Sequence, residues 1–180
     1  RMTAFRTNYF RPLIIALAVF ACACGVRVGY SAVLGIWFSP KGGGQQAIVE
    51  QIDKAQVSID YRMYNFTSGP IGDALVRAHN RGLKVRILLD DDEARKPTSQ
   101  AAKCAHAGIP VYLDGKHAIS HNKARIFDGK RVMFGSFNDS MSAEERNSEE
   151  LVLEDDPRVV KQFQDNFAAH LKHAERMEQK

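Results

Sequence analysis

Strand-like and helix-like segments alternate along most of the chain, and this alternation constrains the fold more than any other feature. The strand-like runs are short and rich in β-branched and aromatic residues, and the helix-like runs carry one apolar stripe. The expected strands span 33–38, 57–64, 84–90 and 110–113, and the expected helices span 45–55, 70–81 and 99–106. Such a succession predicts βαβ units and an α/β fold.

The pattern changes in the last third of the chain. Two strand-like segments, 123–127 and 131–134, flank Asp128-Gly129, a strong hairpin-turn signal. A further strand is expected at 151–153, and a final amphipathic helix begins at Pro157. We therefore predict a mixed, mostly parallel β-sheet sandwiched between helices.

Residues 1–30 have the character of a leader. Three arginines precede the apolar run 13–24, and small residues follow it. This order predicts a signal peptide or an N-terminal membrane anchor, with lipid attachment at Cys22 as a third alternative. Residues 31–180 then form one domain, exported to the periplasm or secreted. If the leader is not cleaved, residues 13–36 associate with the membrane and hold the domain outside the cytoplasm.

Charge and cysteine content narrow the classes of function. Four of the 25 basic residues lie in residues 1–40, which contain no acidic residue, so residues 41–180 carry 21 of each sign. The body is formally neutral and gives no global argument for a nucleic-acid partner. Cys104 is the one cysteine of the body, which excludes an internal disulfide or a metal site of several thiolates there.

Two residue pairs are placed to meet at one edge of the sheet. His121 and Lys123 lie two residues apart at the start of an expected strand, so they share a face. The Asp128-Gly129 turn returns the chain antiparallel and brings Ser136 and Asn138 beside them. An imidazole and three phosphate-binding groups can thus converge.

Phosphoryl transfer needs such a set. A neutral His121 can attack phosphorus, giving a phosphohistidine that water then opens. Lys123 and Asn138 supply donors for the non-bridging oxygens, and Ser136 adds a hydroxyl. Asn147 and Glu149 form a further pair, in which Glu149 could accept a hydrogen bond from His121 and fix its tautomer.

The stretch His121-x-Lys123-x4-Asp128-x6-Gly135-Ser136-x-Asn138 resembles the HKD motif of the phospholipase D superfamily. Asn147-Ser148-Glu149 is similar to a downstream element of its small, single-motif bacterial endonuclease branch, and the likeness covers roughly residues 34–170. The resemblance implies a phospholipase D-like α/β fold with His121, Lys123, Asn138 and Glu149 as catalytic residues. It implies phosphate support from Ser136 and structural roles for Asp128, Gly135 and Asn147.

The resemblance also implies a shared active site, because the family needs two motifs and this chain has one. A C2 homodimer would supply His121 of the partner subunit as the general acid. No metal and no other cofactor is expected. The short segment 40–45 leaves no room for the cysteine-rich zinc module that another branch inserts there.

Three functions remain open at this stage. The first is a metal-independent phosphodiesterase acting as a non-specific endonuclease on DNA or RNA. The second is a phospholipase D-type hydrolase of membrane phospholipids, and the third is a nucleic-acid-binding module without activity. The complete set of site residues argues against the third.

The remaining candidates are given ordinary roles. We expect His117 in a solvated loop, Trp37 and Phe38 in the core, and Asp90-Asp91-Asp92-Glu93 in a solvated acidic loop. His170 and His173 lie three apart on the last helix and could hold a metal, but no third ligand is evident, so a solvated face is favoured. The sequence favours neither a basic rim nor scattered surface charge for four basic residues, namely Arg95, Lys96, Lys116 and Arg125.

Overall fold

The computed structural model describes residues 32–178 of the 180-residue chain. The expected leader, 1–30, lies outside the described residues, whereas residues 33–36 of the candidate membrane segment belong to the first strand. The elements in chain order are β1 (Val33–Ser39), α2 (Gly44–Lys54), β2 (Ser58–Met63), α3 (Gly69–Asn80), β3 (Lys84–Asp90), α4 (Asp91–Ala94), α5 (Ala101–His106), β4 (Val111–Asp114), β5 (Lys123–Phe127), β6 (Arg131–Gly135), α6 (Met141–Glu145), β7 (Glu149–Glu154), α7 (Pro157–Leu171) and β8 (Glu175–Arg176).

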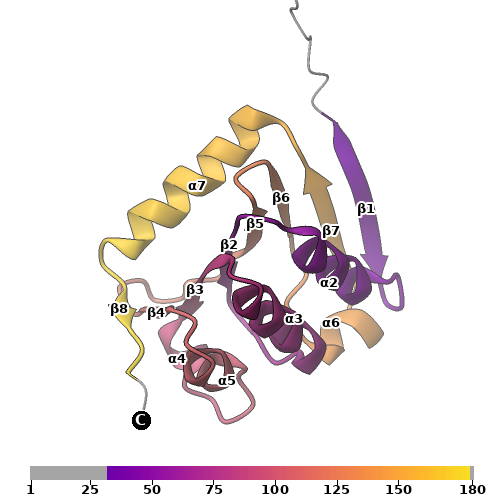
Figure 1. Cartoon of the computed structure of the whole chain (residues 1–180). Coiled ribbons are helices and arrows are strands. Elements are labelled where there is room, and N and C mark those ends of the chain that lie inside the picture. The colour runs from indigo at the N-terminus through magenta and orange to yellow at the C-terminus, as the bar shows by residue number, and fades with distance from the viewer. Residues whose placement is uncertain (1–31, 179–180) are drawn as a thin grey trace, which may run out of the picture. The chain divides into compact units, whose positions relative to one another are not determined.

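The described strands form one sheet in the order β1-β7-β6-β5-β2-β3-β4-β8 (Figure 1). The expected mixed α/β fold is confirmed, but the expectation of mostly parallel pairing is wrong. Only β2–β3 and β3–β4 are parallel, because α3 and the α4–α5 segment are the crossovers that join them. The other neighbouring pairs are antiparallel. Among them, β5, β6 and β7 follow one another in the chain and pair in that order.

Helices cover both faces of the sheet (Figure 1). Alternate side chains of the strands point to opposite faces, so each face has its own apolar cluster. The larger cluster joins β2 and β3 to α2, α3 and α5. The smaller one joins β3, β5 and β6 to α7 through Leu88, Ile126, Val132, Val160 and Phe167. The apolar stripes predicted from the sequence are therefore the helix faces that pack against the sheet.

The turn between β5 and β6 also ties down the start of β2. Asp128 and Gly129 both have positive φ, +56° and +63°, as a tight hairpin turn of this twist requires. The Asp128 carboxylate accepts hydrogen bonds from the backbone N–H groups of Gln56, Val57 and Ser58 at 2.7–3.2 Å. Burial alone would raise the pKa of Asp128, but these amide donors outweigh it and lower the pKa. Asp128 is thus a turn and scaffold residue.

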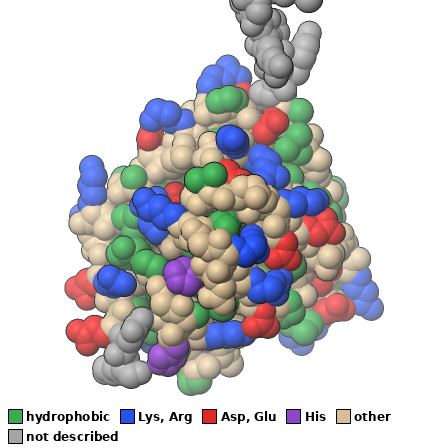
Figure 2. Space-filling view, viewed as in Figure 1, with side chains coloured by type: hydrophobic (Ala, Val, Ile, Leu, Met, Phe, Trp, Pro, Cys, Tyr) green, Lys and Arg blue, Asp and Glu red, His purple; other side chains and the backbone are tan. Residues whose placement is uncertain are grey.

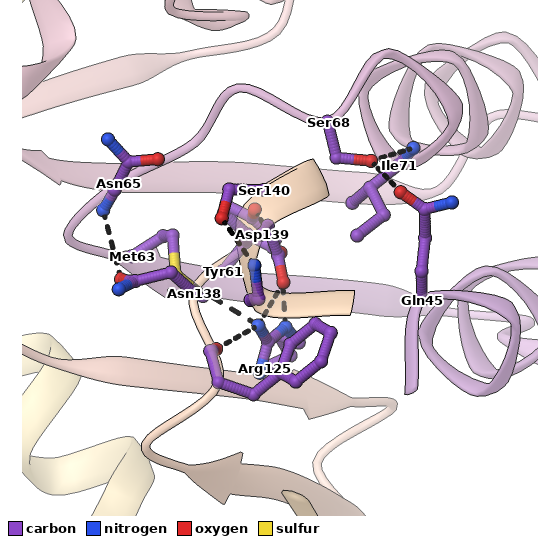
Figure 3. A network of polar contacts seen from close by, with 12 residues as sticks. Gln45, Tyr61, Met63, Asn65, Ser68, Ile71, Arg125, Asn138, Asp139 and Ser140 are labelled. Carbon is purple, nitrogen blue, oxygen red and sulfur yellow. Dashed lines mark hydrogen bonds and ion pairs between the residues drawn. The ribbon is translucent and has the colours of Figure 1, made fainter. Parts of the chain in front are cut away.

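A buried ion pair links β5 to the loop after β6 (Figure 3). The guanidinium of Arg125 and the carboxylate of Asp139 are both fully buried and bonded to each other through two nitrogens. Arg125 also donates to the Phe137 carbonyl at 3.1 Å, and the Tyr61 hydroxyl donates to Asp139. Burial and the adjacent Asp139 raise the pKa of Tyr61 well above its ordinary value, so it stays a donor. Arg125 is therefore part of the core, so neither a basic rim nor scattered surface charge describes it.

The acidic run after β3 is ordered, which contradicts the expected solvated loop. Asp90 caps the short helix α4 by accepting a hydrogen bond from the Glu93 N–H at 3.1 Å. The other oxygen of Asp90 accepts from the Ser120 N–H at 2.9 Å, and both Asp90 and Glu93 are buried. Through the bond to Ser120, Asp90 fixes the loop that leads to His121.

We predict that Arg125→Met lowers the free energy of unfolding by about 3–5 kcal/mol, because it leaves the Asp139 charge buried without a partner. The double variant Arg125→Met/Asp139→Asn should lose less than the sum of the two single variants. Urea unfolding measures both. As the control, Arg86→Met removes a part-exposed ion pair to Asp60 and should cost about 1 kcal/mol. Equal losses at the two arginines would contradict this account.

We predict that Asp128→Asn costs about 1–2 kcal/mol at pH 7, since asparagine tolerates positive φ but carries no charge for the three amides. The folded pKa of Asp128 is lowered, so its contribution is complete above the ordinary value of about 3.9 and is lost as the pH falls through the folded value. The stability difference from wild type should therefore shrink below about pH 3.9. Urea titrations across this range measure it, with the exposed Asp165→Asn as control; a pH-independent difference would refute it.

Candidate active site

His121 and Lys123 lie where the loop after β4 enters β5. Lys123 pairs with Met63 of β2 and is only 7% exposed, whereas His121 is exposed. The Lys123 Nζ donates to the His121 carbonyl oxygen at 3.2 Å. Burial lowers the pKa of Lys123, while the negative charge of Glu149 opposes that shift. The ammonium is therefore held near the nucleophile candidate and is coupled to Glu149.

Tyr64 contacts both members of this pair. Its ring lies 4.5 Å from the His121 ring, centroid to centroid, at an interplanar angle of 57°. The Lys123 Nζ lies 5.1 Å from the centroid of the same ring, a cation–π distance. Sequence analysis assigned no role to Tyr64, although its place directly after β2, at a strand end beside β5, was a usable signal. The Tyr64 ring therefore packs against both the imidazole of His121 and the ammonium of Lys123.

Ser136 and Glu149 meet across the β6–β7 ladder. The Ser136 hydroxyl donates to Glu149 Oε2 at 2.5 Å, and Asn147 Nδ2 donates to Glu149 Oε1 at 2.9 Å. Ser39, a residue that sequence analysis left without a role, accepts from the Glu149 N–H at 3.1 Å and donates to the Asn147 carbonyl at 3.0 Å. These hydrogen bonds fix the Glu149 carboxylate at the place where β6 ends and β7 begins.

The predicted hydrogen bond between His121 and Glu149 is not formed in residues 32–178. The Glu149 oxygens bond to Ser136 and Asn147 instead. The structure thus brings Glu149 into electrostatic contact with Lys123 but not into a hydrogen bond with the imidazole.

Gly135 has a packing role. Its φ is +153°, and a Cβ at this position would collide with the Glu150 carbonyl oxygen of β7. Only glycine lets β6 approach β7 closely enough here for the Ser136 N–H to donate to that carbonyl at 3.1 Å. This contact sets the position of Ser136.

Asn138 lies in the loop that the Arg125–Asp139 pair anchors (Figure 3). Its Oδ1 accepts from the Asn65 N–H at 3.4 Å. No hydrogen bond from its Nδ2 forms within the described part of the chain, so that donor is available to a ligand. Asn138 lines an open hollow of about 440 Å³ together with Tyr64, Asn65, Asn147 and other polar residues. Asn138 and Asn147 therefore border a space large enough for a phosphodiester, and Tyr64 links this space to His121 and Lys123.

The structure also tests the predictions made for Cys104 and for the aromatic pair Trp37 and Phe38. Cys104 is buried, and burial raises its pKa to about 12, in agreement with an inert thiol. Trp37 packs against the core as expected, but Phe38 is 66% exposed, so its core assignment is wrong.

The prediction that His170 and His173 lie on a solvated face is wrong. Both contact the buried Asp114, and the His117 ring lies beside them.

A family model described as "Cardiolipin synthase, PLD-like domain" matches residues 48–171. Phospholipase D of Rickettsia prowazekii is 38% identical over 130 residues, which cover 72% of this chain and 63% of that protein. The crystal structure of Nuc, a phospholipase D family member from Salmonella typhimurium, matches with a TM-score of 0.78 and 31% identity, over 82% of this chain and 99% of Nuc.

This chain belongs to the phospholipase D-like family. Mitochondrial cardiolipin hydrolase of Chlamydomonas reinhardtii is a further relative, 33% identical over 119 residues that cover 66% of this chain and 53% of that protein. The chain spans less than two thirds of the length of these curated relatives. Within residues 32–178, no helix has both the length and the hydropathy needed to cross a membrane.

We predict that Glu149→Gln lowers the pKa of Lys123 further, because it removes the negative charge that favours the ammonium. NMR titration of the lysine side chain, with Lys123→Met used for assignment, measures the shift. The neighbouring Glu150→Gln is the control, since Glu150 points to the opposite face of β7 and is exposed. A larger effect from Glu150 than from Glu149 would contradict the coupling.

Proposed function

We propose that this phospholipase D-like chain is a metal-independent phosphodiesterase that acts as a non-specific endonuclease on DNA, and also on RNA. The observation that carries the proposal is the position of Tyr64. Its ring contacts His121 and the ammonium of Lys123, and it lines an open hollow together with Asn138. The similarity to Nuc extends over 99% of that chain. It therefore supports a small enzyme that consists of one such domain.

In the proposed first step, an imidazole nitrogen of His121 bonds to phosphorus while the bond from phosphorus to the leaving oxygen breaks. Lys123 Nζ and Asn138 Nδ2 bind the non-bridging oxygens, where negative charge builds up. Because His121 is exposed and its ring packs at a tilt against Tyr64, the imidazole is both open to a substrate and restricted in its orientation.

The leaving oxygen needs a proton from the opposite side of phosphorus. In residues 32–178, His79 and His106 lie on α3 and α5, and the remaining histidines gather around Asp114. We therefore propose a C2 homodimer in which His121 of the partner subunit donates this proton. In the second step water gives its proton to that histidine and attacks phosphorus, and the bond from phosphorus to His121 breaks.

Surface charge neither requires nor excludes a nucleic-acid substrate. On the face shown in Figure 2, basic and acidic side chains are interspersed and do not form one large patch of a single sign. Non-specific binding would then depend on the phosphate donors of the site itself.

Phospholipid is the second candidate substrate. Met141, 63% exposed, lines the same hollow as Asn138, and Phe38, 66% exposed, precedes Ser39, which bonds to Glu149. Apolar side chains at the edge of a phosphate site suit a substrate presented at a membrane surface. The curated relatives named above are a phospholipase D and a cardiolipin hydrolase. Export, or anchoring through residues 1–30, stays part of the proposal.

We predict that the full chain nicks supercoiled plasmid in EDTA and that His121→Ala lowers the rate by about a thousand-fold or more, since the nucleophile is lost. His106→Ala, a change at an exposed position of α5, is the matched control and should retain activity.

Three outcomes separate the alternatives. Intact plasmid and single strands together with headgroup release from liposomes would replace the endonuclease by the phospholipase. Equal rates for wild type and His121→Ala would reject the histidine mechanism. An active chain that sediments as a monomer would reject the shared site.

A further inference from the structure

The strongest feature outside the proposed active site is a group of three histidines around one buried aspartate. Asp114 ends β4, His117 lies in the loop that follows, and His170 and His173 come from the last turn of α7 and the turn after it. One ligand atom from each residue lies within 4.8 Å of all the others. Segments that are distant in sequence have thus brought four metal-binding side chains together.

The carboxylate of Asp114 is the centre of this group. It is fully buried, and its two oxygens lie 2.8 Å from His170 Nδ1 and 3.2 Å from His173 Nε2. The His117 ring lies 4.9 Å from the His170 ring and 5.3 Å from the His173 ring, centroid to centroid. The two α7 rings are themselves 5.2 Å apart. The three imidazoles therefore surround one side of a single carboxylate.

We propose that Asp114, His117, His170 and His173 bind a divalent transition metal of the zinc type. Three imidazole nitrogens and one carboxylate oxygen are a donor set that Zn²⁺ accepts, at about 2.0–2.2 Å in tetrahedral geometry. Ligand atoms at such distances lie about 3.3 Å from one another. The contacts to Asp114 are already close to this spacing, and rotation of His117 in its exposed loop closes the rest.

Access and support for the metal are also present. A hollow of about 370 Å³ lined by Asp91, Gly115, Lys116, His173 and Glu175 opens beside the cluster and gives an ion a path from solvent. The Ser120 hydroxyl donates to Asp114 Oδ2 at 3.1 Å and fixes the carboxylate from the other side. A hydrogen-bond partner of this kind orients a ligand and raises its affinity for metal.

Arg62 limits the affinity. Its Nη2 lies 3.6 Å from Asp114 Oδ2 and 3.0 Å from His170 Nδ1, so its charge offsets that of the carboxylate. Arg62 is held by Asn166 at 2.5 Å and Ser120 at 3.2 Å, which keeps the guanidinium in place when a metal binds. We therefore expect weaker binding than at a site of the same ligands without a neighbouring cation.

The role of the metal is structural. It joins the end of α7 to the loop between β4 and β5, and this loop contains both Ser120 and its neighbour His121. Binding would restrict the backbone that carries His121 without supplying any group to phosphorus. The inference does not depend on the proposed activity.

Isothermal titration of the metal-free full chain with Zn²⁺ tests the proposal, and the visible absorption of Co²⁺ reports the geometry. We expect one ion at this site, tetrahedral Co²⁺ bands and an increase in Tm with Zn²⁺. His117→Ala, a change in an exposed loop that should not impair folding, is expected to weaken binding about a hundred-fold or more. His106→Ala, on the exposed face of α5, is the matched control and should bind as wild type does.

Absence of Zn²⁺ binding by wild type, or equal binding by wild type and His117→Ala, would overturn the proposal. The second comparison also removes any contribution from Cys22 and Cys24, which both proteins contain. None of these readouts uses catalytic activity. A failed metal site therefore leaves the endonuclease proposal intact, and a failed plasmid assay leaves the metal site intact.

Discussion

The buried pair of Arg125 and Asp139 is the interaction on which the site depends. It joins β5, which begins with Lys123, to the loop that presents Asn138. The Asp139 carbonyl also accepts from the N–H groups of Thr67 and Ser68, so the segment after β2 is tied to the same point. Removing either charge would leave the other buried and unpaired, so both residues are needed to keep the loop in place. The proposed phosphate donors Lys123 of β5 and Asn138 of the loop after β6 are thereby attached to one buried ion pair.

Around this pair, strand ends carry the side chains of the proposed active site, and local contacts hold them in place. Lys123 is buried against Tyr64, and the carboxylate of Glu149 is bonded through both oxygens. Such preorganisation is what stabilisation of a charged transition state requires, because donors that are already in place need no reorganisation during reaction. The second histidine that the proposed chemistry needs fits a homodimer, since the other described histidines occupy α3, α5 and the Asp114 cluster.

The two ends of the loop from Asp114 to His121 have different chemistry. One end joins the histidine cluster, and the other reaches the proposed nucleophile. Asp90 and Asp114 both bond to Ser120 between them. A metal at the first end would thus stabilise the backbone near the second, while the phosphodiester chemistry stays with imidazole, ammonium and amide groups. A metal that only stabilises the fold is compatible with a reaction that uses no metal, since the two proposed sites share no side chain.

The sequence by itself determined most of the strands and helices, the β5–β6 hairpin, and the place of His121 and Lys123 at the entry to β5. These features follow from local rules, namely side-chain period and the Asp128-Gly129 turn. Tertiary structure alone decided the mostly antiparallel sheet, the burial of Arg125, the partners of Glu149 and the gathering of His117, His170 and His173. Strand order and helix docking bring together residues such as Asp114 and His170, 56 positions apart, and no local pattern records that contact.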